Sequence, residues 1–207
     1  MHLTLRHSRD AAGRLLRPAR PASSLLRCTR GATAVEFALV AMPMLGLIAG
    51  CLAVGFNYFM IAALDHATVS AARAVATGAV STAGMSASTF QQQVVCPRLP
   101  SVFTCSNVFV NMQVVAGGNS PSSFYSYVNS AQSGLIVPPL DSSKDTFCPG
   151  AGSQYVVLQV VYPAPVLVSF LSPSAPTTFN GQRVNVLMSS TTFKSEPYSG
   201  AQAYKGC

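Results

Sequence analysis

Few side chains in this 207-residue sequence could carry out acid–base, nucleophilic or metal chemistry. Charged residues make up only 9% of the chain, against roughly a quarter in an ordinary soluble domain. Beyond the first thirty residues His66 is the only imidazole, and Asp141 and Asp145 lie in a polar DSSKDT stretch typical of a solvated turn. The sequence has no glycine-rich phosphate loop and no dinucleotide fingerprint. We therefore expect no enzyme activity, no cofactor and no metal site, and a structural or binding role instead.

The positive charge of the chain lies in an N-terminal tail and not on the face of a folded domain. The net charge is +7, and seven of the ten arginines lie in the first thirty residues, where Asp10 is the only acid. We therefore expect this tail to orient a membrane segment, and we expect no binding of nucleic acid.

An uncharged apolar stretch follows the tail. Residues 37–64 contain no charged side chain and are bounded by Glu36 and Asp65. About twenty apolar residues suffice to cross the hydrocarbon core of a bilayer, and the apolar region of a cleaved secretory signal is shorter. The stretch therefore predicts a transmembrane helix. Because positive charge precedes it, its N-terminus should lie in the cytoplasm and the C-terminal portion of the chain should be exported.

The helical pattern continues beyond the apolar stretch as far as Gly78. A helix over residues 33–77 would be on the order of 70 Å long, more than twice the thickness of a bilayer core. Its second half must then support a small domain outside the membrane. A narrow apolar stripe at helical spacing could pack against that domain: Leu64, Ala67, Ala71 and Val75.

After residue 80 the pattern changes to that of an α+β domain. Residues 87–96 predict a short helix with Ser88 as its N-cap. Alternation of apolar and polar residues then predicts three strands, at 107–115, 154–162 and 183–193. We expect a small antiparallel sheet packed on the long N-terminal helix, a pilin-like plan.

The segments between the predicted strands are less regular. Residues 116–150 are rich in Gly, Ser, Pro and Asn and predict a long loop, with a short helix at 123–132. Pro163 and Pro165 are expected to end the second strand. The apolar patch VLVSFL at 166–171 is either a short helix that caps the sheet or an exposed surface for partners.

Cysteine positions give an independent indication of topology. Cys28 precedes the apolar stretch and Cys51 lies inside it, which leaves four cysteines in the exported portion: Cys96, Cys105, Cys148 and Cys207. An even number in an oxidising compartment predicts two disulfides. Of the three possible connectivities we favour Cys96 with Cys105, which closes a small loop, and Cys148 with Cys207, which ties the long loop to the chain end. A zinc site is the competing interpretation, but the spacing has no CxxC.

The junction between the tail and the apolar stretch has a specific form, RGATAVEF at residues 30–37. A basic leader that ends in Gly31, followed by four uncharged residues, Glu36 and Phe37, resembles the processing site of type IV prepilins. The longer run RGATAVEFALVAMPMLGLI, residues 30–48, resembles the opening of the TadE/TadG-like pseudopilins of the tight-adherence (Tad, or Flp) pilus system.

Two further features are similar to this family. TTFKSEPY resembles the (F)RxEPF-type ending of these proteins through Glu196, Pro197 and Tyr198, while Lys194 stands where arginine is more usual. The pair Cys96 and Cys105, which flanks a short loop after a predicted helix, also has the form seen in the family. The resemblance covers the N-terminal helix and the end of the chain.

The resemblance implies that a prepilin peptidase cuts after Gly31, so that Ala32 becomes the mature N-terminus and Glu36 the fifth residue. It implies a single-pass protein of the bacterial inner membrane with three parts: a cytoplasmic leader (1–31), a long helix (32–79) and a periplasmic domain (80–207). Its partners would be the lipid bilayer, the peptidase, other pilus or pseudopilin subunits and the Tad secretion machinery. The function would be that of a minor pseudopilin-like component of pilus assembly, and the alternative is a generic single-pass anchored periplasmic binding or scaffold protein.

Several residues of the apolar helix also have an ordinary interpretation. Glu36 is either the partner of a neighbouring subunit's free amine or an acid in the first helical turn, favoured by the helix macrodipole. Pro43 should kink or loosen the helix, although many membrane helices tolerate proline. Gly46 and Gly50 form a GxxxG face for close helix packing, although glycine is common in membrane helices.

Overall fold

The computed structural model describes residues 32–117, 120–166, 177–204 and 207. The expected leader with Gly31, and all but Val166 of the apolar patch at 166–171, lie outside the described residues. Residues from Ile48 to Cys207 form one compact unit, and the chain up to Leu47 forms another. Within the described residues, this first unit consists of the N-terminal turns of helix α1 (Ala32–Ala76).

Helix α1 is continuous over 45 residues and passes through Pro43 without interruption. The predicted long helix is therefore confirmed. It ends where Gly78 adopts a φ of 79°, a left-handed conformation that glycine reaches without steric cost. The N–H groups of Thr77 and Gly78 donate to the carbonyl oxygens of Arg73 and Val75, at 3.1 and 3.0 Å, and satisfy two acceptors of the last turn.

Two short helices follow, α2 (Ala79–Thr82) and α3 (Ala87–Phe90). The N-cap of α3 is Ser86 and not Ser88 as predicted, because the Thr89 N–H donates to Ser86 Oγ at 3.2 Å. Ser86 has the extended backbone that a capping side chain requires, with φ −76° and ψ 164°. A π-helical turn (Gln91–Val95) and a 3-10 turn (Cys96–Arg98) continue from α3.

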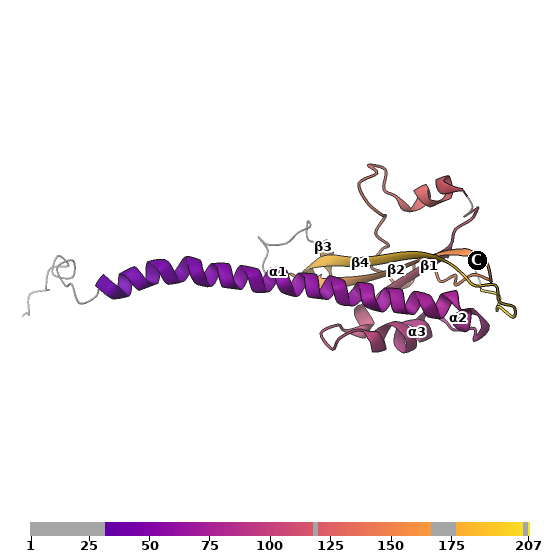
Figure 1. The fold of residues 1–207 in the computed structure, drawn as a ribbon, viewed down its shortest axis with the longest axis horizontal. Coiled ribbons are helices and arrows are strands. Elements are labelled where there is room, and N and C mark those ends of the chain that lie inside the picture. Colours follow the sequence, from indigo (N-terminus) through magenta and orange to yellow (C-terminus); the bar gives the residue numbers. More distant parts are fainter. Residues whose placement is uncertain (1–31, 118–119, 167–176, 205–206) are drawn as a thin grey trace, which may run out of the picture. The chain divides into compact units, whose positions relative to one another are not determined.

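The sheet has four antiparallel strands in the order β1-β2-β4-β3 (Figure 1). They are β1 (Phe109–Val114), β2 (Tyr155–Pro165), β3 (Thr177–Phe179) and β4 (Gln182–Lys194). The expected α+β architecture is confirmed. The short strand β3 was not predicted, although Asn180 and Gly181, at φ 48° and 77°, form the two-residue turn that an Asn-Gly pair favours.

Strand β2 continues through Pro163 and Pro165, so the prediction that these prolines end the strand is wrong. The Val115 N–H donates to the Tyr155 carbonyl at 2.9 Å, and alternation then points the backbone nitrogens of residues 155, 157, 159, 161, 163 and 165 toward β1. Val161 pairs with Phe109, the first residue of β1. Both prolines therefore lie beyond the end of β1, where a missing N–H costs no ladder hydrogen bond.

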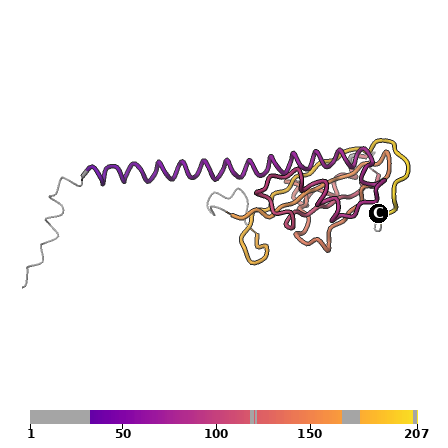
Figure 2. Tube along the Cα trace, turned by 90° about the horizontal axis from the view of Figure 1, so that it is seen from below, coloured from indigo at the N-terminus to yellow at the C-terminus, as the bar shows by residue number. Residues whose placement is uncertain are grey.

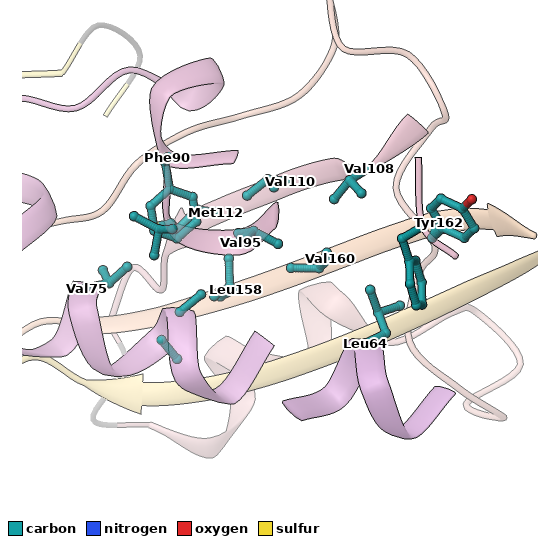
Figure 3. Close-up of a cluster of buried hydrophobic side chains, with 14 of the residues drawn as sticks. Leu64, Val75, Phe90, Val95, Val108, Val110, Met112, Leu158, Val160 and Tyr162 are labelled. Atoms are coloured by element: carbon teal, nitrogen blue, oxygen red, sulfur yellow. The ribbon is translucent and has the colours of Figure 1, made fainter. Parts of the chain in front are cut away.

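One face of the sheet packs on α1, α3 and the turn after it. The stripe predicted on α1 is buried: Leu64 is 1% exposed, and Ala67, Ala71 and Val75 are 0% exposed. In Figure 3, Leu64 and Val75 from α1 point toward the same core as Leu158 and Val160 from β2. Because alanine occupies two positions of this stripe, the helix and the sheet can approach closely.

The segment between β1 and β2 covers the opposite face of the sheet and is therefore more than a surface loop (Figure 1). It contains a 3-10 helix at Pro121–Tyr127, where a helix over 123–132 was expected. Amide side chains on this face connect the layers: Asn111 Nδ2 donates to Gln159 Oε1 at 3.1 Å, and Gln159 Nε2 donates to the Ile136 carbonyl at 3.3 Å. Gln159 is 3% exposed, so these hydrogen bonds satisfy a buried polar group.

Candidate membrane anchor and processing junction

The predicted processing junction begins at the edge of the described residues. Gly31 lies outside them, and Ala32 is the first residue of α1. Glu36 and Phe37 are exposed on the helix, Phe37 to 74%. The junction residues Ala32, Glu36 and Phe37 therefore lie on regular helix, with the acid and the aromatic ring available to a partner.

The position of Glu36 on α1 bears on its two interpretations. Because α1 already includes Ala32, Glu36 lies beyond the first helical turn, which has no acidic residue. The favourable interaction of an acid with the helix macrodipole falls off within that turn. The helix terminus therefore offers little stabilisation to the Glu36 carboxylate, which leaves it in need of another partner if it enters lipid.

The apolar half of α1 presents an unbroken apolar surface. Every large apolar side chain from Val35 to Phe59 is exposed, by 39% to 77%. Among the described residues, α1 is the one helix that is long and apolar enough to cross a membrane. At 1.5 Å per residue, residues 33–59 provide about 40 Å of helix, which exceeds a hydrocarbon core of about 30 Å.

The packing of the sheet sets the C-terminal limit of this apolar surface. Met60 is 2% exposed and Leu64 is 1% exposed, because both pack into the core beneath the sheet. Asp65 and His66, which follow, are exposed to solvent. The run in which every large apolar side chain is exposed therefore ends at Phe59, and beyond it only the face of α1 away from the sheet, with Ala62, stays exposed.

The residues expected to pack helices have open surroundings. A Cβ added to Gly46 would meet no atom within 4 Å. Gly50 is half-buried, and Pro43 is exposed on the continuous helix. A neighbouring helix could therefore approach Gly46 closely without displacing any part of this chain.

The motif Glu196-Pro197-Tyr198 contacts the far end of α1. The Glu196 N–H donates to the carbonyl oxygen of Ala76 at 2.8 Å, while the Glu196 carboxylate side chain is exposed. Tyr198 Oη lies 3.0 Å from Ser81 Oγ and 3.2 Å from the Gly150 carbonyl, and its one hydrogen can be donated to either of them. Figure 2 shows the chain returning to the C-terminal end of α1 after β4. The motif thus connects the end of the chain to the end of the helix.

Two glycines make room for Tyr198, and neither was singled out from the sequence. A Cβ on Gly78 would lie 2.6 Å from the Tyr198 ring, and a Cβ on Gly152 would lie 2.6 Å from the Tyr198 backbone. Since real side chains do not tolerate such contacts, both positions require glycine. The glycine that ends α1 therefore also forms the surface on which the tyrosine ring rests.

The cysteines form the two pairs that the sequence favoured. Cys96 is bonded to Cys105, and Cys148 is bonded to Cys207. The first disulfide closes a loop of residues 96–105, which we call the disulfide loop. The second joins the segment before β2 to the chain end, beyond the contacts of Tyr198. Cys51, on the apolar half of α1, is an exposed free cysteine.

The acids of the DSSKDT stretch lie together outside the sheet. Burial and, to a smaller extent, the charge of Asp141 together raise the pKa of Asp145 to about 6. Asp145 Oδ1 is buried without a hydrogen-bond partner. Hydrogen bonds from Ser143 lower the pKa of Asp141. The stretch is therefore not the simple solvated turn that its sequence suggested.

Other features give little indication of chemistry. Within the described ranges, His, Cys, Asp and Glu form no group of three that could hold a metal ion. A pocket of about 250 Å³ lies over the outer face of the sheet, lined by Asn111, Gln113, Tyr127, Pro138 and Gln159 among others. Another, of about 370 Å³, lies beside Tyr204 and Gln154. Neither contains an acid, a histidine or a free thiol.

Comparison with known proteins finds one similarity, in the N-terminal part of the chain. A family model described as TadE-like protein matches residues 31–73, which include the expected junction and most of α1. No curated protein and no solved structure matches the chain. The Glu196-Pro197-Tyr198 motif and the two disulfides lie outside the matched segment. Over residues 31–73, about a fifth of its length, the chain is similar to the TadE-like family.

Proposed function

We propose that this protein is a minor pseudopilin-like component of a Tad pilus assembly system. The observation that carries the proposal is the TadE-like helix itself, with Glu36 and Phe37 exposed five and six residues after Gly31. The protein has three parts in this proposal: a cytoplasmic leader (1–31), a long helix (32–79) and a periplasmic domain (80–207). Its role is structural, without catalysis, a cofactor or nucleic acid.

The proposed orientation places the N-terminus in the cytoplasm and the domain in the periplasm of a bacterium. The net charge of +6 before residue 31 favours a cytoplasmic tail. The two disulfides favour an oxidising compartment for the other side. An inner-membrane location satisfies both conditions at once.

Cleavage after Gly31 by a prepilin peptidase would give Glu36 its partner. The new N-terminus at Ala32 carries a free amine, and the exposed Glu36 of one subunit can pair with the amine of the next. A carboxylate near the membrane is costly unless it is paired, so this pairing would select neighbouring subunits. The open surface at Gly46 would allow their helices to pack.

Cleavage is tested by expressing the full chain with and without a prepilin peptidase and measuring the N-terminus by mass spectrometry. We expect a product that begins at Ala32 only when the peptidase is present. Gly31→Val should abolish this product, because the branched side chain crowds the scissile bond. Gly46→Val introduces the same side chain fifteen residues further on, where space is open, and should still be cut.

The outcome also separates the proposal from its alternative. A chain that keeps its leader in the presence of an active peptidase would contradict processing and favour a generic single-pass anchored scaffold. A second measurement addresses assembly: co-purification with other Tad pilus subunits should weaken in Glu36→Gln, which keeps size and hydrogen bonding but removes the charge. Unchanged co-purification would argue against pairing through Glu36.

A further inference from the structure

We propose that the disulfide loop, residues 96–105, inserts its tip into the interfacial layer of the membrane in which α1 is anchored. The inference rests on the membrane anchoring proposed above. It concerns a second contact between the protein and lipid, made by the domain itself and separate from the transmembrane helix.

The first observation is the level of the loop along α1. The rings of Phe103 and Tyr162 meet edge to face, with centroids 4.7 Å apart, and the Thr104 N–H donates to Tyr162 Oη at 3.3 Å. In Figure 3, Leu64 lies on the Tyr162 side of the core and Val75 lies on the opposite side. Met60, Leu64, Phe103 and Tyr162 belong to one buried cluster. The loop therefore lies at the level of residues 60–64 of α1.

That level coincides with the edge of the lipid-facing surface. The unbroken run of exposed large apolar side chains on α1 ends at Phe59, and the next exposed charged residue along the helix is Asp65. Six helical residues correspond to about 9 Å along the axis. The interfacial layer of a bilayer is about 5 to 8 Å thick on each side of the hydrocarbon core. A loop at residues 60–64 therefore lies within or directly above this layer.

The chemistry of the tip suits such a layer. Residues 99–107, LPSVFTCSN, contain no ionisable side chain apart from the bonded cysteine. Val102 is 40% exposed at the tip, while its neighbour Phe103 is 8% exposed and holds the loop to the domain. Arg98, the charged residue of the loop, is hydrogen-bonded to Ser70 on α1. Transfer of the exposed Val102 side chain from water to apolar lipid is therefore favourable.

The loop also has the fixed position that insertion requires. The Cys96–Cys105 disulfide closes it, and Arg98 Nε donates to Ser70 Oγ on α1 at 2.7 Å. Figure 1 shows the segment after α3 pointing back along α1 toward the N-terminal end of the helix. The apolar tip is therefore held toward the lipid-facing turns of α1 and adds its surface to theirs.

Because the chain has no tryptophan, a single introduced tryptophan can report its own surroundings. The test uses three full-length variants, Val102→Trp, Tyr58→Trp and Tyr125→Trp, each reconstituted at low protein-to-lipid ratio in phosphatidylcholine vesicles. The vesicles carry bromine on the acyl chains near the headgroup. Tyr58, 69% exposed, lies on the anchor, and Tyr125, 66% exposed, lies on the other face of the sheet.

We expect Val102→Trp and Tyr58→Trp to lose fluorescence in brominated vesicles and to emit at shorter wavelength than Tyr125→Trp. Tyr125→Trp should keep its intensity and remain open to an aqueous quencher. A Ser101→Trp variant, at an exposed position of the same tip, should behave like Val102→Trp. It replaces Val102→Trp as the reporter if the substitution at Val102 disturbs the loop.

Three results would overturn the inference, for different reasons. Quenching of Tyr58→Trp without quenching at positions 101 and 102 would leave the anchor intact and remove the loop contact. Absence of quenching at Tyr58→Trp would contradict membrane anchoring itself. Shielding of position 102 that grows with the protein-to-lipid ratio would indicate that the loop contacts another protein molecule and not lipid.

Discussion

The backbone N–H of Glu196 donates a hydrogen bond to the carbonyl oxygen of Ala76, with 2.8 Å between nitrogen and oxygen. Ala76 is the last residue of α1, so its carbonyl has no partner further along the helix. The segment after β4 supplies that partner, and Tyr198 then covers Gly78. The segment after β4 therefore adds a hydrogen bond and a ring contact to the buried stripe that attaches α1 to the sheet. Substitutions at this contact should measure its share of the stability.

Gly78→Ala should destabilise the full-length protein in detergent, as measured by urea unfolding. The left-handed conformation costs an alanine about 1 to 2 kcal/mol, and a methyl group 2.6 Å from the Tyr198 ring adds a steric cost of about 1 to 3 kcal/mol. Gly181→Ala is the matched control, because its φ is 77° but nothing lies within 4 Å of the added Cβ. Equal losses in the two variants would show that the ring contact is unimportant.

Tyr198→Phe should cost about 1 kcal/mol in the free energy of unfolding, because it removes one hydroxyl that donates in a partly buried site. The ring would still cover Gly78, and Ser81 Oγ would keep its hydrogen bond to the Gly150 carbonyl at 2.9 Å. Tyr125→Phe, at a site 66% exposed, should change stability by less than about 0.5 kcal/mol. A larger loss at Tyr125 than at Tyr198 would contradict this account of the tail.

The two disulfides should contribute unequally to stability. In the chain-entropy relation, a bond between residues separated by 59 positions, as for Cys148 and Cys207, is worth about 4 kcal/mol, and one separated by 9, as for Cys96 and Cys105, about 3 kcal/mol. Replacing each pair by alanines and measuring urea midpoints tests the order. Mass spectrometry of unreduced peptides should find these two linkages, and any other pairing would exclude the prediction.

Leu64→Ala should destabilise the domain by about 3 kcal/mol, because it leaves a cavity where the side chain was 1% exposed. Leu52→Ala makes the same change on the same helix, at a side chain 70% exposed, and should alter stability by less than about 0.5 kcal/mol. Thermal unfolding in detergent, followed by near-ultraviolet circular dichroism, compares the two. Similar losses in the two variants would mean that the sheet does not bury Leu64, so that the run of exposed large apolar side chains would not end at Phe59.

Stability should fall as pH rises from about 4 to 6 if Asp145 contributes as its surroundings indicate. Its pKa is raised to about 6 in the fold from 3.8, so the native state holds the proton more tightly than the unfolded state across this range. The stabilisation is complete below the unfolded value and is lost as pH passes the folded value. Because the side chain is only half-buried and solvent screens it, we expect an effect below about 1 kcal/mol.

Asp145→Asn should remove this pH dependence and be slightly more stable than the parent protein at pH 7. Asp141→Asn is the control: loss of the neighbouring negative charge should lower the pKa of Asp145 and weaken the slope without abolishing it. Urea midpoints measured at pH 4, 5, 6 and 7 compare the three proteins. An Asp145→Asn variant that keeps the full slope would assign the titration to another group.

The prediction of elements from sequence succeeded where periodicity was strong. The length of α1, its buried stripe and three strands were predicted from spacing, because a helix or strand repeats its buried side at a fixed interval. The errors came from contacts between segments. Pro163 and Pro165 were expected to end β2, but strand β1 begins at Phe109, opposite Val161, and leaves the edge at both prolines unpaired. The turn at Asn180 and Gly181 was a local signal that was overlooked.

The candidate site divides in the same way. Gly31, Glu36 and Phe37 could be singled out because their spacing is itself the signal, and hydropathy gave the apolar stretch. The sequence could not show that the run of exposed large apolar side chains ends at Phe59, because Met60 and Leu64 are as apolar as the residues before them. Only their burial under the sheet distinguishes Met60 and Leu64 from those residues. Ser81, Gly150 and Gly152 carry no pattern that points to Tyr198.

The sequence by itself determined that this chain has one long helix, apolar in its first half, a charged tail before it and a small α+β domain after it, since charge, length and periodicity are local properties. The tertiary structure decided what covers each face of the sheet, where the anchor stops being available to lipid, and why the chain end carries Glu196-Pro197-Tyr198. Those features are hydrogen bonds and packing between residues as far apart as 120 positions, as for Ala76 and Glu196. Local pattern contains no information about contacts at that separation, because they form only when the whole domain has folded.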